Sequence, residues 1–250
     1  MAGDAAATIK GDQGRLFSGS QMASLAAAAH ELKTPLATTS YLAQLLSDNG
    51  RNLNESDRII YLEQIRLSAQ RGMQLVDGIT QLFNTTQIEL ELEPVNVANV
   101  CEDVLQELTP LVRELGQKIE FTQSHRGEPL ALAHHTLLRS VLTNLCDNAI
   151  KHNPQKQSVH VALTDDHGHI RVAVRDNGPR MLARDFKVLK RRLGREIYPI
   201  KGRTGSSGLG LYIAAHLTEA MKGKLELVRH HKQGATFALT LQPSYQLSFL

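Results

Sequence analysis

The chain has 250 residues, of which 42% are hydrophobic and 21% charged, and a formal net charge of +3. This length predicts one or two domains. The composition is that of a globular protein and excludes wholesale disorder, a collagen helix and a continuous coiled coil. The mild charge and an aromatic content of only 4% argue against a nucleic-acid partner, because such surfaces need clustered cations or stacking rings.

The sequence has neither a secretory signal pattern nor a membrane-spanning pattern. The N-terminus lacks a basic start followed by an apolar core, and every apolar run is far shorter than the ~20 residues that span a bilayer. The two cysteines, Cys101 and Cys146, lack the spacing of a disulfide or zinc framework, which fits a reducing compartment. We therefore expect a soluble, cytoplasmic chain without membrane contact of its own, and leave open a membrane-anchored region upstream.

The first 88 residues predict a tail followed by two helices. Residues 1–19, rich in Ala, Gly, Asp and Ser, are typical of a flexible tail or linker. Two apolar repeats with alternating steps of four and three then flank a turn-rich stretch at residues 47–54, where Asn54 is suited to cap the second helix, with Asp57 at its third position. The repeats are Leu25, Ala29, Leu32, Leu36, Thr39, Ala43, Leu46 and Leu62, Ile65, Ala69, Gly72, Val76, Ile79, Phe83.

Two helices with narrow apolar seams and a short connection predict an antiparallel hairpin. A two-helix hairpin cannot enclose its own seam. Pairing with a second copy would give a four-helix bundle, so we expect a homodimer. The alternative is that the hairpin packs on the remainder of the same chain.

After residue 88 the pattern changes to a mixture of strands and helices. We expect helices at residues 99–115, 136–151 and 209–221, and strands at 93–97, 118–122, 129–133, 158–164, 169–175, 224–228 and 235–241. Residues 165–168 (DDHG) predict a hairpin turn between two of these strands. The fold class is therefore α+β, in which the helical hairpin precedes an α/β sandwich with a largely antiparallel sheet and helices on one face.

The first chemical motif is HELKTPL at residues 30–36, on the first predicted helix. A neutral imidazole, here His30, is a competent nucleophile near neutral pH, and the neighbouring Glu31 can accept a hydrogen bond or a proton from it. Thr34 lies one turn further on the same face. Pro35 costs about 3 kcal/mol in a helix interior, so its presence in a strong heptad predicts a compensating interaction. A solvated His–Glu pair is the alternative interpretation.

The second motif is NLCDNAIKH at residues 144–152. Its polar members fall at i, i+4, i+7 and i+8 and share one helical face: Asn144, Asn148, Lys151 and His152. Asn oxygens suit Mg²⁺, and a Lys on the same face can neutralise phosphate oxygens. The opposite face is apolar and is expected to pack in the core; the alternative is that the polar face is merely solvated.

Two glycine motifs follow. Asp176-Asn-Gly178 comes directly after a strand, where a carboxylate can accept a hydrogen bond from an exocyclic amine and Gly permits close backbone approach. Residues 205–211 (GSSGLGL) open a helix, and the N–H groups of such a turn form an anion site. The second motif is neither a P-loop nor a dinucleotide fingerprint, because the required Lys-Ser/Thr and parallel βαβ unit are missing. Each motif alone is weak support for phosphate binding.

In this order, the four motifs resemble the H, N, G1 and G2 boxes of the sensor histidine kinases of two-component signalling, over about residues 20–243. The resemblance implies a dimerisation and histidine-phosphotransfer domain at residues 20–88, followed by an ATP-binding domain at 93–245 of the histidine kinase, chaperone and gyrase type. It further implies ATP-dependent autophosphorylation, phosphotransfer to an aspartate of a response regulator receiver domain, and regulator phosphatase activity. ATP and Mg²⁺ are the implied cofactors.

The resemblance also implies roles for individual residues. His30 would be the phosphoacceptor, Glu31 its acid/base partner and Thr34 the holder of the water that dephosphorylates the regulator. Asn148 would ligate Mg²⁺ with help from Asn144. The ATP site would comprise Asn144, Asn148, Lys151, His152, Asp176, Gly178, Gly205, Gly208, Leu209 and Gly210, with Asp176 reading the adenine amino group.

Two departures from the family pattern leave alternatives open. Arg180 stands where the family usually has a second glycine, and its side chain would crowd the adenine pocket or fix a different loop path. The stretch at residues 180–204, where the family has its ATP lid, is divergent and strongly basic. It predicts either a lid near the triphosphate or a solvated docking surface. One alternative function is therefore a kinase-deficient scaffold or phosphatase that signals by protein binding. Another is an ATPase of the chaperone, topoisomerase and mismatch-repair group, although the H box argues against it.

Overall fold

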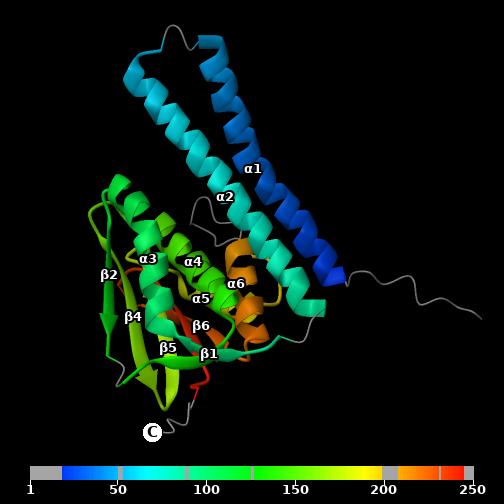
Figure 1. Ribbon diagram of the computed structural model, residues 1–250, viewed down its shortest axis with the longest axis vertical. Helices are drawn as coiled ribbons and strands as arrows, with labels where there is room; N and C mark the ends of the chain where they lie inside the picture. The colour runs from blue at the N-terminus through cyan, green and yellow to red at the C-terminus, as the bar shows by residue number, and fades with distance from the viewer. Residues whose placement is uncertain are drawn as a thin grey trace, which may run out of the picture.

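The computed structural model describes residues 19–49, 53–87, 90–124, 127–198, 208–230 and 232–244. The expected tail at residues 1–19 lies outside them except for Gly19, at which the first helix begins. Helices α1 (Gly19–Asn49) and α2 (Glu55–Gln87) form the predicted hairpin, which projects from a mixed α/β body (Figure 1). Within the described residues, no helix combines the length and apolar character needed to cross a bilayer.

The start of α2 is fixed by the predicted cap. The Asp57 backbone N–H donates to Asn54 Oδ1 at 2.7 Å, and Asn54 Nδ2 donates back to the Asp57 carboxylate at 2.9 Å. This reciprocal pair satisfies a backbone donor that the first turn of a helix leaves without a partner. Asp57, at the third position, therefore helps Asn54 to cap the N-terminus of α2.

Each heptad repeat divides into two sets of positions. In α1, Leu32, Thr39 and Leu46 are partly buried inside the hairpin, whereas the alternate members, among them Leu36 and Ala43, are exposed. In α2 the same alternation places Ile65, Gly72 and Ile79 inward and leaves Leu62, Ala69 and Val76 exposed. One half of the seam therefore joins α1 to α2, and the other half forms an apolar stripe that nothing in the described chain covers.

The second body contains a five-stranded sheet in the order β2-β4-β5-β7-β6. Its strands are β2 (Lys118–Gln123), β4 (Ser158–Asp166), β5 (His169–Arg175), β6 (Lys224–Arg229) and β7 (Ala235–Leu241). The β2–β4 pair is parallel and the other pairs are antiparallel, as predicted for a largely antiparallel sheet. A separate two-stranded sheet joins β1 (Glu93–Asn96) to β3 (Leu130–Ala133), a pairing that the sequence pattern did not indicate.

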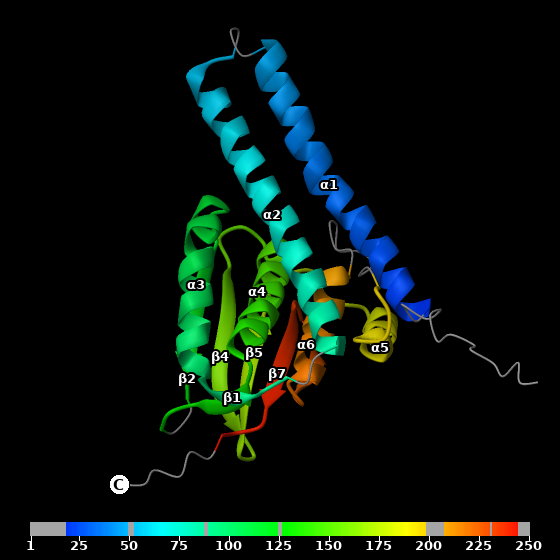
Figure 2. The same ribbon diagram turned by 45° about the vertical axis from the view of Figure 1, so that its right-hand side comes forward.

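One face of the large sheet carries three helices, α3 (Val97–Glu114), α4 (His135–His152) and α6 (Leu209–Ala220) (Figure 2). Alternate residues of β4 and β5, such as Val161 and its cross-strand partner Val174, are buried against them. The apolar face of α4 closes the same core through Leu142, Leu145 and Ile150, each at most 1% exposed. The predicted sandwich, with helices on one face of the sheet, is confirmed.

The hairpin also contacts this second body. Leu75, Ile79 and Leu82 of α2 pack against the core, and a Cβ placed on Gly78 would lie 3.0 Å from Ile213 Cδ1 of α6. The C-terminal part of α2 therefore rests on α6, while the start of α2 lies at the far end of the molecule (Figure 1). Packing of the hairpin on the remainder of the chain is therefore compatible with pairing to a second copy, because the contact with α6 leaves the outer stripe exposed.

The basic stretch at residues 180–204 differs from its prediction. Residues Ala183–Arg192 form a helix, α5, with Leu189 buried and Phe186 and Leu193 packed on the core. These apolar residues follow a helical spacing, but many interspersed cations hide the periodicity in the sequence. Phe186 thus serves to anchor α5 to the sandwich.

Candidate functional site

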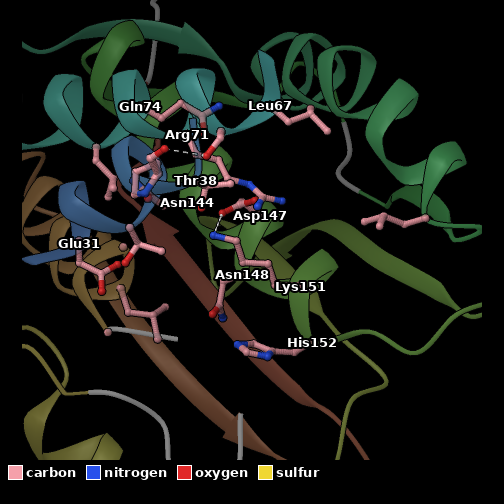
Figure 3. Close-up of a pocket in the computed structure, with 18 of the residues that line it drawn as sticks. Glu31, Thr38, Leu67, Arg71, Gln74, Asn144, Asp147, Asn148, Lys151 and His152 are labelled. Carbon is pink, nitrogen blue, oxygen red and sulfur yellow. Dashed lines mark hydrogen bonds and ion pairs between the residues drawn. The ribbon is translucent and has the colours of Figure 1, made fainter. Parts of the chain in front are cut away.

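A cleft of about 770 Å³ lies between the hairpin and the helical layer of the sandwich. Its size falls within the roughly 300–1,000 Å³ typical of small-molecule sites. The hairpin contributes Glu31 and Thr34, and the sandwich contributes the polar face of α4 and the start of α6. Figure 3 shows the side chains of Glu31, Arg71, Asn148, Lys151 and His152 around it. Motifs more than 100 residues apart in the sequence therefore share one cavity.

The proline of the first motif sets the register of the hairpin at the cleft. Pro35 lies inside α1, is buried, and removes the backbone donor that would serve the Glu31 carbonyl. The Ser68 hydroxyl of α2 donates to the Pro35 carbonyl at 3.0 Å, and Gly72 lies beside the proline ring. This hydrogen bond and the burial of the ring are favourable interactions of the proline turn, although the bond does not replace the donor lost to the Glu31 carbonyl. His30 is exposed, directly before Glu31 and one turn from Thr34.

The polar face of α4 forms the opposite wall. Asn144, Asn148, Lys151 and His152 all line the cleft, as their spacing predicts. Asn144 Nδ2 donates to the Ser140 carbonyl at 3.0 Å, which leaves its oxygen available as a ligand. Lys151 forms an ion pair with Asp147 one turn earlier (Figure 3). His152 is 7% exposed, so its imidazole borders the cavity from a buried position.

The two glycine motifs meet this wall through close backbone approach. A Cβ on Gly178 would lie 2.4 Å from the His152 carbonyl oxygen, and one on Gly210 would lie 3.1 Å from Asn144 Oδ1. Gly208 has φ +83°, in the left-handed region, and a Cβ there would lie 2.2 Å from the Tyr198 carbonyl oxygen. Gly178 and Gly208 are therefore required by a neighbouring backbone, whereas Gly210 meets only the end of a side chain. Gly208 and Gly210 line the cleft directly.

Asp176 is placed behind the cleft. It follows β5, is 1% exposed, and its Oδ1 accepts the Gly178 backbone N–H at 2.8 Å. The Leu209 side chain is 1% exposed in the core and does not line the cavity. Gly205 lies outside the described residues, as do Lys201 and Arg203 of the basic stretch. Arg180 is exposed and does not line the cleft. Asp176 does not line it either, so the effect of Arg180 on an adenine pocket stays a prediction.

Several cleft residues were missed by the sequence reasoning. Arg71, Thr38 and Gln74 come from the hairpin, and Asp147 comes from α4. Nothing in their local sequence distinguishes them from solvated helix positions, because their place depends on how the hairpin leans on the sandwich. The helical periodicity does put Arg71 and Gln74 on one face, which is the signal that was available.

The two cysteines play no part in this cavity. Burial raises the pKa of the Cys101 thiol to about 12, and burial together with the neighbouring Cys101 raises the pKa of Cys146 further still. Both thiols are therefore protonated at neutral pH and unsuited to nucleophilic or ligand roles. Burial also lowers the pKa of His216, whose ring packs on Tyr212 of α6.

Comparisons with known proteins agree with this arrangement. Residues 20–86 match the "His Kinase A (phospho-acceptor) domain" family and residues 133–244 the "Histidine kinase-, DNA gyrase B-, and HSP90-like ATPase" family. The chain is 28% identical over 226 residues to the sensor protein GacS of Pseudomonas syringae pv. syringae, covering 87% of this chain and 24% of that protein. It is also 28% identical to the adaptive-response sensory kinase SasA of Gloeothece citriformis, covering 87% of this chain and 56% of the relative.

Solved structures show the same fold. Full-length ShkA in complex with AMPPNP is 25% identical with a TM-score of 0.58, covering 87% of this chain and 45% of ShkA. The histidine kinase AdeS of Acinetobacter baumannii is 20% identical with a TM-score of 0.59, covering 85% of this chain and 97% of that one. The chain thus spans about a quarter to three fifths of the length of the first curated relatives it matches.

We expect Gly178→Ala to lower the free energy of unfolding of the sandwich by about 1–3 kcal/mol, because the added methyl group meets a backbone carbonyl that cannot rotate away. Gly210→Ala is the matched control, since its methyl group meets the end of the Asn144 side chain, which can shift. Urea unfolding measures both variants. Equal stability of the two would contradict the close approach described for Gly178.

Proposed function

The chain is the catalytic core of a sensor histidine kinase, and on that premise we propose that it binds ATP in the cleft and phosphorylates His30. The phosphoryl group then passes to an aspartate of a response regulator in two-component signalling. Residues 20–88 act as the dimerisation and phosphotransfer domain and 93–245 as the ATP-binding domain. The observation that carries the proposal is the shared cleft, in which Glu31 and Thr34 of the hairpin face Asn148 and Lys151 of α4.

The residues present fit a magnesium–nucleotide complex. Asn148 Nδ2 is a hydrogen-bond donor that is buried without a partner among the described residues, which suits it to a phosphate oxygen. The oxygen of Asn144 is left available for a ligand, because only its Nδ2 is used by the Ser140 carbonyl. Amide oxygens on this face, those of Asn144 and Asn148, would hold Mg²⁺, which would supply positive charge to neutralise the phosphates. Lys151 and His152 contact phosphates, and Gly208 and Gly210 let backbone amides approach them. The Asp176 carboxylate accepts a hydrogen bond from the adenine amino group.

His30 attacks the γ-phosphorus in line. A bond forms between an imidazole nitrogen and phosphorus, and the bond from phosphorus to the β,γ-bridging oxygen breaks, so that ADP leaves with the electron pair. Glu31 takes up or orients the proton of the other ring nitrogen. The protein's main contribution is positioning and charge neutralisation, as in other phosphoryl transfers.

The exposed imidazole then serves a second reaction. A carboxylate oxygen of a receiver-domain aspartate forms a bond to phosphorus, and the bond from phosphorus to the ring nitrogen breaks with its electron pair left on nitrogen. The proton held by Glu31 or by the other ring nitrogen makes the released imidazole neutral. A related kinase, ThkA, has been solved in complex with its response regulator TrrA; it is 17% identical to this chain with a TM-score of 0.60, covering 88% of this chain and 61% of ThkA. Thr34, exposed one turn after His30, holds the water that hydrolyses the regulator's acyl phosphate, which makes the protein bifunctional.

The protein acts as a homodimer. The exposed half of each heptad repeat forms one apolar stripe, in which Leu36 is 64%, Leu62 51% and Val76 44% exposed. A continuous stripe of this kind on a helical hairpin is covered by a second copy in a four-helix bundle. Packing of α2 on α6 leaves this stripe open, so dimerisation does not compete with the contact between the domains.

We expect His30→Gln to abolish labelling by γ-labelled ATP, because glutamine lacks the nucleophilic ring nitrogen. His169→Gln, at an exposed position on β5, is the control and should label normally. Acid treatment should release the label from the wild-type protein, as a phosphoramidate requires. Undiminished labelling of His30→Gln would refute the phosphoacceptor, and a wild-type protein that takes up no label would favour the kinase-deficient scaffold.

Asn148→Ala should weaken Mg·ATP binding at least tenfold, since it removes the oxygen ligand from the polar face of α4. Calorimetric titration measures the affinity, and thermal unfolding shows whether the variant remains folded. Asn99→Ala, exposed on α3 outside the cleft, should bind like the wild-type protein. Unchanged affinity of Asn148→Ala would remove Asn148 from the site.

Replacing two stripe residues, Leu62→Glu with Val76→Glu, should convert the dimer to a monomer, because like charges would face each other in the bundle. Sedimentation equilibrium should give the wild-type protein twice the mass of one chain. Gln44→Glu with Gln70→Glu adds the same charge at exposed positions off the heptad and should remain dimeric. A dimer that survives both pairs of substitutions would place the interface elsewhere.

A further inference from the structure

A buried amide network lies at the C-terminal end of α4, beyond the residues that line the cleft. Gln117 and Asn153 are 8% and 6% exposed. Gln117 Nε2 donates to the Ile150 carbonyl at 3.1 Å and to the Asn153 carbonyl at 2.7 Å. The last carbonyls of a helix have no intrahelical donor, so Gln117 stabilises this end of α4.

Asn153 connects the same helix end to the loop after β5. Its Oδ1 accepts the Asn177 backbone N–H at 2.9 Å, while its Nδ2 donates to the Gln157 carbonyl at 2.8 Å. Asn177 Nδ2 in turn donates to the Ser158 carbonyl at 2.7 Å. The Asn153 side chain is thus held from both of its polar ends, and one of them fixes the peptide group between residues 176 and 177.

That peptide group belongs to the loop that carries Asp176. The next backbone N–H, of Gly178, donates to Asp176 Oδ1, and Gly178 itself lies against the His152 carbonyl. Two consecutive N–H groups are therefore aligned, one by Asn153 and one by the Asp176 carboxylate. Backbone hydrogen bonds from Asp176 N–H to the Ala235 carbonyl and from Gly234 N–H to the Gly178 carbonyl hold the loop to the β7 side, and the Asn153 contact holds it to the end of α4.

We propose that Asn153 is a positioning residue for recognition of the nucleotide base. It fixes the spacing and orientation of the Asp176 carboxylate relative to the phosphate- and metal-binding face of α4. This inference rests on the proposed function, because it assigns Asp176 to the adenine amino group. Asn153 touches no nucleotide; it acts through the Asn177 peptide.

The readout that distinguishes positioning from mere stability is base discrimination. ATP and inosine triphosphate share the ribose and triphosphate and differ in the base at position 6, where an amino group is replaced by a carbonyl. A site built to hydrogen-bond a substrate group rejects an analogue that lacks it by large factors. A variant that is only less stable loses affinity for both nucleotides together, whereas a misplaced Asp176 loses the preference between them.

The test compares Asn153→Leu with Gln117→Met in the full chain. Both remove buried amide hydrogen bonds at the same helix end, but only the first removes the link to the Asp176 loop. We expect the wild-type protein and Gln117→Met to share one ratio of ATP to inosine triphosphate affinity, and Asn153→Leu to reduce that ratio at least tenfold. Binding is measured at a temperature where thermal unfolding shows each variant to be folded. If Asn153→Leu does not fold, Asn153→Ser removes the same link at smaller steric cost and is expected to reduce the ratio in the same direction.

The outcomes separate the two claims. A wild-type protein that prefers ATP, together with a folded Asn153 variant that keeps the full preference, overturns the inference and leaves the proposed function intact. Equal loss of preference in Gln117→Met also overturns it, because the effect would then be one of helix-end stability. A wild-type protein that binds neither nucleotide, or that does not distinguish them, overturns the proposed base recognition and the inference with it.

Discussion

The structure depends on the amphipathic character of α4. Its apolar face is sealed into the core by Leu142, Leu145 and Ile150, and this burial fixes the rotation of the helix about its axis. The polar face must then point away from the sheet, toward the hairpin. At about 25 cal/mol per Å² of buried apolar surface, rotating the helix would cost far more than solvating the polar residues would return. The orientation of the cleft wall is thus a consequence of core packing.

In the hairpin, apolar periodicity has a different consequence from that in α4. A heptad on each of two helices offers two sets of apolar positions, and one hairpin can bury only one of them. Between members of the inner set, the Ser68 hydroxyl donates to the Pro35 carbonyl, which fixes the level of α1 against α2. The outer set stays exposed and is available to pack against a second copy of the hairpin. Packing on α6 uses yet another side of α2, around Gly78, where the absence of a side chain lets Ile213 approach.

Much of this could be predicted from the sequence because it is local. The two heptads, the Asn54 cap, the polar face of α4 and the turn between β4 and β5 each follow from periodicity or a short-range hydrogen bond. The β1–β3 pairing could not, since strands of four residues carry almost no register information. Helix α5 was missed because its cations mask its apolar spacing. Arg71 was missed because its place at the cleft depends on how the hairpin leans on the sandwich. Asn153 was missed because its partners Gln117 and Asn177 are distant in sequence.

The glycines explain why the motifs lie where they do. Gly178 occurs where the loop after β5 approaches α4 more closely than a side chain allows, at the His152 carbonyl, and Gly210 lies close to the end of the Asn144 side chain on the same helix. The same two approaches bring the strand end that carries Asp176 and the helix start that carries Gly208 to opposite ends of one polar helix face. The base and the triphosphate of a single nucleotide need recognition elements separated in this way. The distance between the loop that carries Asp176 and the helix start that carries Gly208 is set by the length of α4 from Asn144 to His152, about two helical turns. This fixed length is the physical reason why motifs on three separate elements can act as one site.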